Sequence, residues 1–257
     1  MALQFDRRKM LVGFDIDLTL NDHRGEYRGG IYRDGGYDAY RLVACTLMDR
    51  YPEAGITPPS DQSLNVSHRT HHSQDDIFRY HFPGIEPGAA REIWDTLDHH
   101  NFAVKGAPET IRQLRSDGYP LFILTSKPQP MINQRLDECS ISPDNFLFII
   151  STDQEDFQKP DPGVFIELVQ PAIQELKGKK VRSLSLRRAV YVGDHPDDYQ
   201  AAETAGKIIG GPKGIAVPSG YYSKGDLLGY DIPQDDIIDE IAHLPKHLKS
   251  LEEAAVV

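Results

Sequence analysis

Short apolar runs recur along this chain, and most of them end abruptly in polar residues. The runs predict β-strands at residues 10–14, 120–124, 146–150 and 189–192, with a fifth strand within residues 208–217. A continuous apolar run is typical of a strand that is buried on both faces. Such burial is what a parallel sheet covered by helices on both sides requires.

Apolar residues at helical spacing lie between most of these runs. They predict helices at residues 40–51, 90–97, 108–118, 162–172, 199–205 and 235–243. We expect Pro171 to kink or end the helix that contains it, because proline has no N–H to donate. Residues 58–81 are polar and rich in histidine, which predicts a long solvated loop. From about residue 103 the helices and strands alternate, and this order indicates βα units and a parallel sheet.

Composition excludes some partners. The chain has 257 residues, of which 39% are hydrophobic and 26% charged, as in soluble globular proteins. A formal net charge of −11 argues against a nucleic acid or an anionic membrane as the main partner. Two cysteines are too few for a disulfide framework, and the first residues lack the apolar length of a signal peptide or a membrane span. We therefore expect a cytoplasmic protein, either monomer or homodimer.

Polar side chains that suit one another chemically follow four of the strands or βα junctions. In chain order they are Asp15 and Asp17, then Thr125 and Ser126, then Lys159, and last Asp194 and Asp198. Because the carboxyl ends of parallel strands lie along one edge, we expect these groups to meet there. Crowded carboxylates need a cation, and hard oxygen ligands suit Mg²⁺. A lysine and a hydroxyl group suit the oxygens of a phosphate.

Some of these residues, when they are considered alone, are compatible with other kinds of site. Asp15 and Asp17 would also suit a calcium loop or the metal-binding pair of a glycosyltransferase, although an EF-hand would need glycine where Leu20 stands. The histidines of the polar loop do not match the usual zinc spacings, so a solvated loop is favoured over a zinc site; they are His68, His71, His72 and His81.

The set as a whole resembles the four motifs of the haloacid dehalogenase superfamily. The matching segments are Asp15-Ile-Asp17-Leu-Thr19, then Thr125, then Lys159-Pro160-Asp161-Pro162, and last Val192-Gly193-Asp194 with Asp198. Residues 23–102 are similar in position and length to the helical cap of the phosphoglycolate-phosphatase-like branch. His195 departs from the pattern, because a serine is frequent at that position.

The resemblance implies an α/β fold: a Rossmann-like parallel sheet flanked by helices, with an inserted helical cap domain. Residues 1–22 and 103–257 would form the hydrolase core, and residues 23–102 the cap with its preceding loop or flap. The cap would recognise the substrate. The candidates for this recognition are Arg24, Arg28, His68, Arg69 and Arg79.

The resemblance also implies an activity, namely a magnesium-dependent phosphatase that hydrolyses a small phosphorylated metabolite through an aspartyl-phosphate. Asp15 would be the nucleophile and Asp17 the acid and base. Phosphate would be held by Thr125, Ser126 and Lys159, and Mg²⁺ by Asp15, the backbone carbonyl of Asp17, Asp194 and Asp198. A phosphomutase on the same intermediate and a catalytically quiet binding or regulatory domain stay open. Dehalogenation is less favoured, because Asp17 is replaced in that branch.

Overall fold

The computed structural model describes residues 9–22, 36–71, 73–97, 102–178 and 184–254. The chain divides into two compact units, which are described separately. Unit 1 comprises residues 1–21 and 103–257, and unit 2 comprises residues 22–102. The candidates Arg24 and Arg28 lie outside the described residues.

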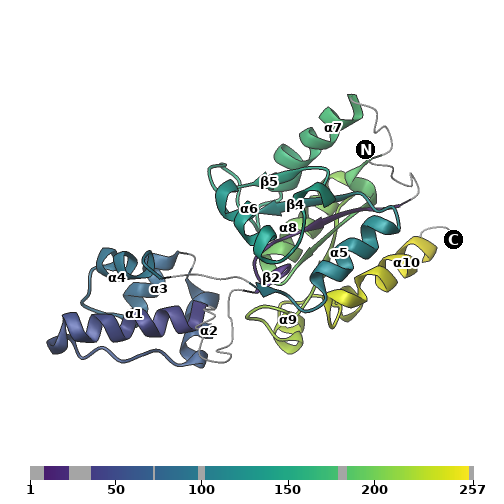
Figure 1. Ribbon diagram of the computed structural model, residues 1–257. Helices are drawn as coiled ribbons and strands as arrows, with labels where there is room; N and C mark the ends of the chain where they lie inside the picture. The colour runs from purple at the N-terminus through teal and green to yellow at the C-terminus, as the bar shows by residue number, and fades with distance from the viewer. Residues whose placement is uncertain (1–8, 23–35, 72, 98–101, 179–183, 255–257) are drawn as a thin grey trace. The chain divides into compact units, whose positions relative to one another are not determined.

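Unit 1 is built on a five-stranded sheet in the order β5-β4-β1-β6-β7, in which every pairing is parallel (Figure 1). The strands are β1 (Leu11–Phe14), β4 (Leu121–Thr125), β5 (Ile149–Ser151), β6 (Ala189–Gly193) and β7 (Lys213–Ala216). All five lie at or within the predicted ranges, give or take one residue. The α/β prediction with a parallel sheet is confirmed.

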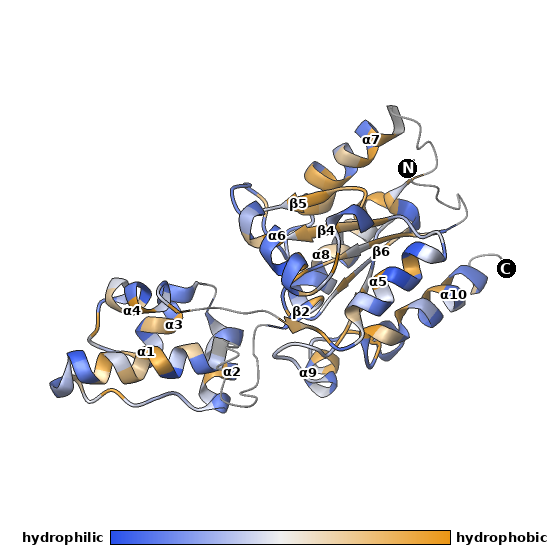
Figure 2. Cartoon of the chain, in the orientation of Figure 1, coloured by the Kyte–Doolittle hydropathy of each residue, from blue (hydrophilic) through white to orange (hydrophobic). Residues whose placement is uncertain are grey.

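Both faces of this sheet are buried, and each has its own core. In β1, Val12 and Phe14 pack into one cluster and Leu11 into the other, because successive strand residues point to opposite faces. The first face is covered by α5 (Ala107–Ser116), α6 (Gln129–Glu138) and α10 (Leu244–Ala254). The second is covered by α7 (Gln170–Gly178) and α8 (Pro196–Ile209). Apolar residues follow the strands and the inner helix faces (Figure 2).

The structure corrects two helix predictions in unit 1. Pro171 does not end its helix, since a π-helical segment, Val164–Val169, runs directly into α7; the expected kink stays a prediction. No helix spans residues 235–243; two short 3₁₀ turns, Gln234–Asp236 and Ile241–His243, lie there instead. Ile237 makes a bridge to Ala216 of β7, which requires extended backbone between the turns. Three helices had not been predicted: α6, α9 (Lys224–Gly229) and α10.

Unit 2 is helical, and its helices enclose a separate apolar core around Tyr40, Phe78 and Phe82. The elements are α1 (Gly36–Arg50), a 3₁₀ turn (Pro52–Ala54), α2 (Asp61–Thr70), α3 (Gln74–His81) and α4 (Pro87–Trp94). Two short strands, β2 (Asn21–Asp22) and β3 (Phe102–Ala103), pair where the chain leaves and re-enters unit 1. None of the described helices is long and apolar enough to cross a membrane.

The expected loop at residues 58–81 is wrong, because α2 and α3 occupy most of it. A serine begins each helix: Ser60 Oγ accepts the N–H of Ser63, and Ser73 Oγ accepts the N–H of Asp76. Such N-caps satisfy backbone donors that the first helical turn leaves open. Few apolar side chains, such as Leu64, are enough to anchor these polar helices in the core.

Candidate active site

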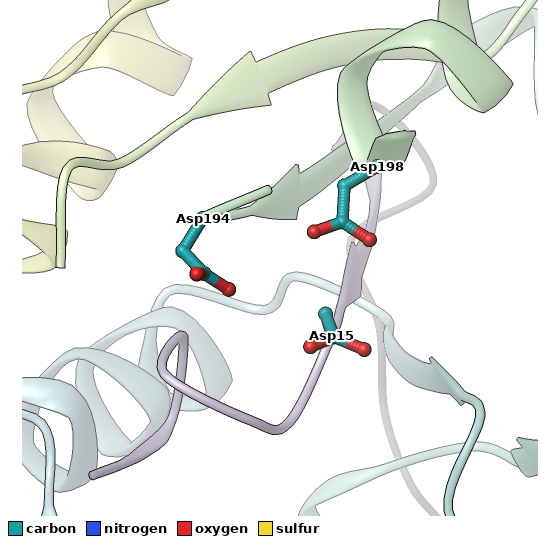
Figure 3. Close-up of side chains that lie close together, drawn as sticks. All are labelled: Asp15, Asp194 and Asp198. Atoms are coloured by element: carbon teal, nitrogen blue, oxygen red, sulfur yellow. The ribbon is translucent and has the colours of Figure 1, made fainter. Parts of the chain in front are cut away.

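Three acidic side chains come together at the carboxyl edge of the sheet. Asp15 follows β1, Asp194 follows β6, and Asp198 lies in the first turn of α8. Since β1 and β6 are neighbours in parallel register, their carboxyl ends lie side by side. Figure 3 shows the three carboxylates facing a common space. One oxygen from each lies within 4.8 Å of the others, and all three residues are buried.

Lys159 closes the acidic cluster from a loop that follows β5. Its Nζ lies 2.8 Å from Asp15 Oδ1 and 2.5 Å from Asp198 Oδ1. It also donates to the hydroxyl oxygen of Tyr191 at 3.1 Å. Burial alone would lower the pKa of Lys159, but Asp15 and Asp198 outweigh burial and raise it well above its usual value. Lys159 is therefore a fixed cation.

One lysine does not neutralise three buried carboxylates. Burial raises the pKa of Asp15, although the Lys159 charge opposes this effect. Burial, followed by the charges of Asp198 and Asp15, raises the pKa of Asp194 well above its usual value. Raised pKa values mean that keeping all three carboxylates ionised is unfavourable in free energy when only Lys159 opposes their charge. A bound cation would stabilise the ionised form. The buried, convergent oxygen set thus fits a metal ion.

Two further contacts orient these acids. Thr19 Oγ1 donates to Asp194 Oδ1 at 3.2 Å. The backbone N–H of His195 donates to Asp198 Oδ2 at 3.1 Å. His195 is the N-cap of α8, and its Nδ1 accepts the N–H of Asp197 at 3.1 Å. The histidine therefore fills the capping role for which a serine would also serve.

Asp17 points to a different set of partners. Its Oδ2 lies 3.0 Å from Lys127 Nζ, and its Oδ1 pairs with the Arg135 guanidinium. Leu18 has a positive φ of 58°, and its N–H donates to the carbonyl of Asn21, three residues further on, at 2.6 Å, so the chain turns sharply after Asp17. The Asp17 carboxylate is not one of the three that converge. Its predicted link to a metal through the backbone carbonyl stays a prediction.

The two cations beside Asp17 differ in exposure, and the side chain of Lys127 is 34% exposed. Burial lowers the pKa of Lys127, and it lowers the pKa of Arg135 to about 10. Arg135 comes from α6, and its side chain is only 11% exposed. Buried cations are stable only beside a negative charge, and Asp17 supplies one here.

The other predicted residues of unit 1 lie at the end of β4. Thr125 is the last residue of β4 and is buried, whereas Ser126 is exposed. Thr125 Oγ1 accepts the backbone N–H of Lys127 at 3.4 Å. Because β4 is the neighbour of β1, Thr125 and Asp15 emerge from adjacent strands. A phosphate-binding role for Thr125 and Ser126 stays a prediction.

The described specificity candidates belong to unit 2. The His68 ring stacks on Tyr37 and meets the edge of Tyr40. Arg79 Nη1 pairs with Asp76 one turn earlier in α3, at 2.7 Å. Arg69 lies in the last turn of α2. These contacts lie within unit 2, so substrate recognition by these residues stays a prediction.

Three site residues were not predicted from the sequence. Tyr191 lies within the apolar run of β6 and reads there as core. Arg135 lies on a helix that the apolar pattern did not reveal. Lys127 directly follows Thr125 and Ser126, so its position after a strand is a signal that could have identified it.

The fold and the site define an α/β enzyme with buried carboxylates and a lysine at the carboxyl edge of a parallel sheet. Residues 37–209 match the family model described as haloacid dehalogenase-like hydrolase. The chain belongs to this hydrolase family, and the resemblance seen in its motifs is confirmed.

Curated relatives and solved structures agree with the family match. A phosphoglycolate phosphatase of Yersinia pestis is 30% identical over 76% of this chain and 77% of its own length. A phosphoglycolate phosphatase of Pseudomonas putida is 31% identical over 39% of this chain, a match that spans 33% of that enzyme. A haloacid dehalogenase-like protein of unknown function from Agrobacterium tumefaciens has the same fold. Its TM-score is 0.63 at 17% identity, covering 95% of this chain and 99% of that one.

Proposed function

We propose that this hydrolase is a magnesium-dependent phosphatase that releases phosphate from a small phosphorylated metabolite through an aspartyl-phosphate. The observation that carries the proposal is the buried cluster of Asp15, Asp194 and Asp198 closed by Lys159. The family match and the phosphatases among its relatives make the chain a phosphomonoester hydrolase. The relatives are named phosphoglycolate phosphatases, so phosphoglycolate is the first substrate to test.

In the proposed reaction an oxygen of Asp15 attacks phosphorus, and the bond to the alcohol oxygen breaks. Asp17, once released from Lys127 and Arg135 and protonated, gives that proton to the departing alkoxide, which leaves as an alcohol. A water molecule then loses a proton to Asp17 and attacks the same phosphorus. Inorganic phosphate departs, and the Asp15 carboxylate is restored. Each residue thus ends the cycle in its starting form.

Other side chains stabilise charge during this transfer. Mg²⁺ held by Asp15, Asp194 and Asp198 would neutralise negative charge on the phosphoryl oxygens. Lys159 would hold one of those oxygens, with Thr125 and Ser126 donating hydrogen bonds to others. Phosphoryl transfer depends mainly on such positioning and charge stabilisation. We also propose a cytosolic location, because two cysteines are too few for a disulfide framework.

The proposal is tested by phosphate release from a panel of small phosphate esters that includes phosphoglycolate. EDTA should abolish release, and added Mg²⁺ should restore it. Asp15→Asn should reduce kcat at least about 10³-fold, because the amide is a poor nucleophile. Asp137→Asn, at an exposed position of α6, is the matched control and should keep full activity.

Activity that survives both chelation and Asp15→Asn would overturn the mechanism. Product analysis separates the alternatives. A phosphomutase would convert one phosphate ester into an isomer and release little phosphate. A binding domain would take up Mg²⁺ without forming an aspartyl-phosphate.

A further inference from the structure

Tyr191 is a fully buried residue whose hydroxyl group lies inside the acidic site. The residue is in β6, three positions before Asp194. Its Oη accepts a hydrogen bond from Lys159 Nζ at 3.1 Å and donates one to the carbonyl of Leu124 at 2.6 Å. The ring packs edge-on against Phe165, with centroids 5.1 Å apart. Packing and hydrogen bonding together hold this hydroxyl in one place.

The ammonium group of Lys159 has three N–H bonds and three acceptors. Two of the acceptors are carboxylate oxygens, from Asp15 and Asp198, and the third is the Tyr191 hydroxyl. The tyrosine proton is directed to Leu124, which leaves an oxygen lone pair for the lysine. The direction of both hydrogen bonds is therefore fixed.

The three acceptors differ in what else they can do. Resting on the proposed function, Asp15 carries the phosphoryl group during turnover, and Asp198 faces the metal. Both carboxylates then share their oxygens with new partners. A neutral hydroxyl group is a poor ligand for Mg²⁺ beside carboxylates, and Tyr191 is already tied to Leu124. Tyr191 is thus the acceptor that Lys159 keeps throughout the cycle.

The hydrogen bond to Leu124 adds a second link. Leu124 directly precedes Thr125 in β4, and the two strands β4 and β6 lie on either side of β1. The hydrogen bond from the Tyr191 hydroxyl to Leu124 therefore links β6 to β4, the two strands on either side of β1. We propose that Tyr191 is a positioning residue, which aims Lys159 at the transferring phosphoryl group and fixes it relative to Thr125.

Tyr191→Phe tests this role, because it removes the hydroxyl and keeps the packed ring. We expect kcat to fall about tenfold, and both the inhibition constant for inorganic phosphate and KM for the ester to rise, because the same lysine holds a phosphoryl oxygen of each. Loss of a merely structural hydrogen bond would lower thermal stability and leave these constants unchanged.

Tyr119→Phe is the matched control. Tyr119 is also fully buried, and its hydroxyl also accepts a hydrogen bond from a lysine, Lys9, although it donates to a carboxylate, Glu252, and not to a backbone carbonyl. This triad involves none of the site residues. Tyr119→Phe should lower the melting temperature and leave kcat and phosphate inhibition as in the wild type. If Tyr191→Phe behaves in the same way as Tyr119→Phe, the positioning role is wrong.

A measurement without turnover complements the kinetics. A buried ammonium with three acceptors should exchange its protons slowly and give a ¹⁵N-detected NH₃⁺ signal, which Lys159→Arg would assign by its disappearance. Absence of this signal in the wild type would overturn the inference even if Tyr191→Phe did not fold. A wild type with a clear signal but no phosphatase activity would instead overturn the proposed function.

Discussion

At the scale of single residues, Gly220 shows how closely the backbone approaches the acidic cluster. A methyl group built on its Cα would overlap Oδ2 of Asp194. The other carboxylate oxygen of Asp194, Oδ1, accepts a hydrogen bond from the Thr19 hydroxyl. The carboxylate is thus confined between a hydroxyl group and bare backbone, and even one additional carbon atom would displace it.

We predict that Gly220→Ala weakens metal binding. Displacement of one carboxylate ligand should raise the Mg²⁺ concentration for half-maximal phosphate release about tenfold, while excess Mg²⁺ restores most of the rate. A magnesium titration of activity measures this effect. Gly229→Ala is the control, because a methyl group there meets no atom within 4 Å. An unchanged magnesium requirement in Gly220→Ala would contradict the prediction.

A site residue can be predicted from the sequence where a polar residue interrupts an apolar pattern. Asp15 and Asp194 stand out because each ends an apolar run, and Lys159 stands out beside prolines. Tyr191 has no such signal, since its ring is apolar and only its last atom is chemically active. Arg135 could not be recognised either, because its role depends on which side of α6 faces the sheet.

At the scale of elements, α3 places a half-buried histidine, His81, against the core residues Tyr40 and Phe82 of unit 2. His81 Nε2 lies 2.9 Å from Ser67 Oγ, and the His81 ring lies edge-on to Tyr80. Burial, helped by the charge of His71, lowers the pKa of His81 to about 4. In the unfolded chain the histidine pKa is roughly 6.5.

This difference predicts a pH-dependent stability. Between pH of about 6.5 and 4, the unfolded chain binds a proton that the folded chain does not, so stability falls as the pH falls. His81→Asn should reduce the loss of melting temperature between pH 7 and pH 5. His243→Asn, at an exposed position, should keep the wild-type slope. Equal slopes in wild type and His81→Asn would exclude His81 as the source.

Helices α2 and α3 also show where pattern reading fails for elements. Because these helices contain few apolar residues, their helical spacing is a weak signal, and the polar, histidine-rich composition predicts a loop instead. Ser60 and Ser73 each precede a helix and were usable start signals. The strands were predicted well, because a doubly covered parallel sheet demands an apolar residue at nearly every position. Short helices such as α9 contain too few turns for the spacing of their apolar residues to be recognised.

At the scale of the whole molecule, one carboxylate in unit 1, that of Glu252, holds together three separate segments of the chain. Glu252 in α10 accepts hydrogen bonds from Tyr119 at 3.1 Å and from the backbone N–H of Met10 at 3.3 Å, and it pairs with Lys9 at 2.9 Å. Three segments far apart in the sequence meet at this carboxylate. Its side chain is 17% exposed, so solvent screens these contacts only in part.

We predict that Glu252→Gln destabilises unit 1 without affecting the chemistry. Loss of the charge should lower the free energy of unfolding by about 1–2 kcal/mol, the value of a partly buried charged hydrogen bond. Urea denaturation measures the change, and kcat should stay at the wild-type value. Glu253→Gln alters an exposed neighbour and should change neither. If Glu252→Gln lost activity but kept the wild-type stability, the purely structural role of Glu252 would be wrong.

Asp198 divides its two oxygens between folding and chemistry. Oδ2 accepts the N–H that opens α8, as half of a capping box, while Oδ1 meets Lys159. A library of variants selected only for heat resistance would therefore retain this aspartate, even if every member had lost its activity. Persistence of Asp198 among descendants of this protein would thus be weak evidence that they still perform catalysis. Asp15 has no such capping duty among its hydrogen bonds described above, so its retention would be the more informative marker.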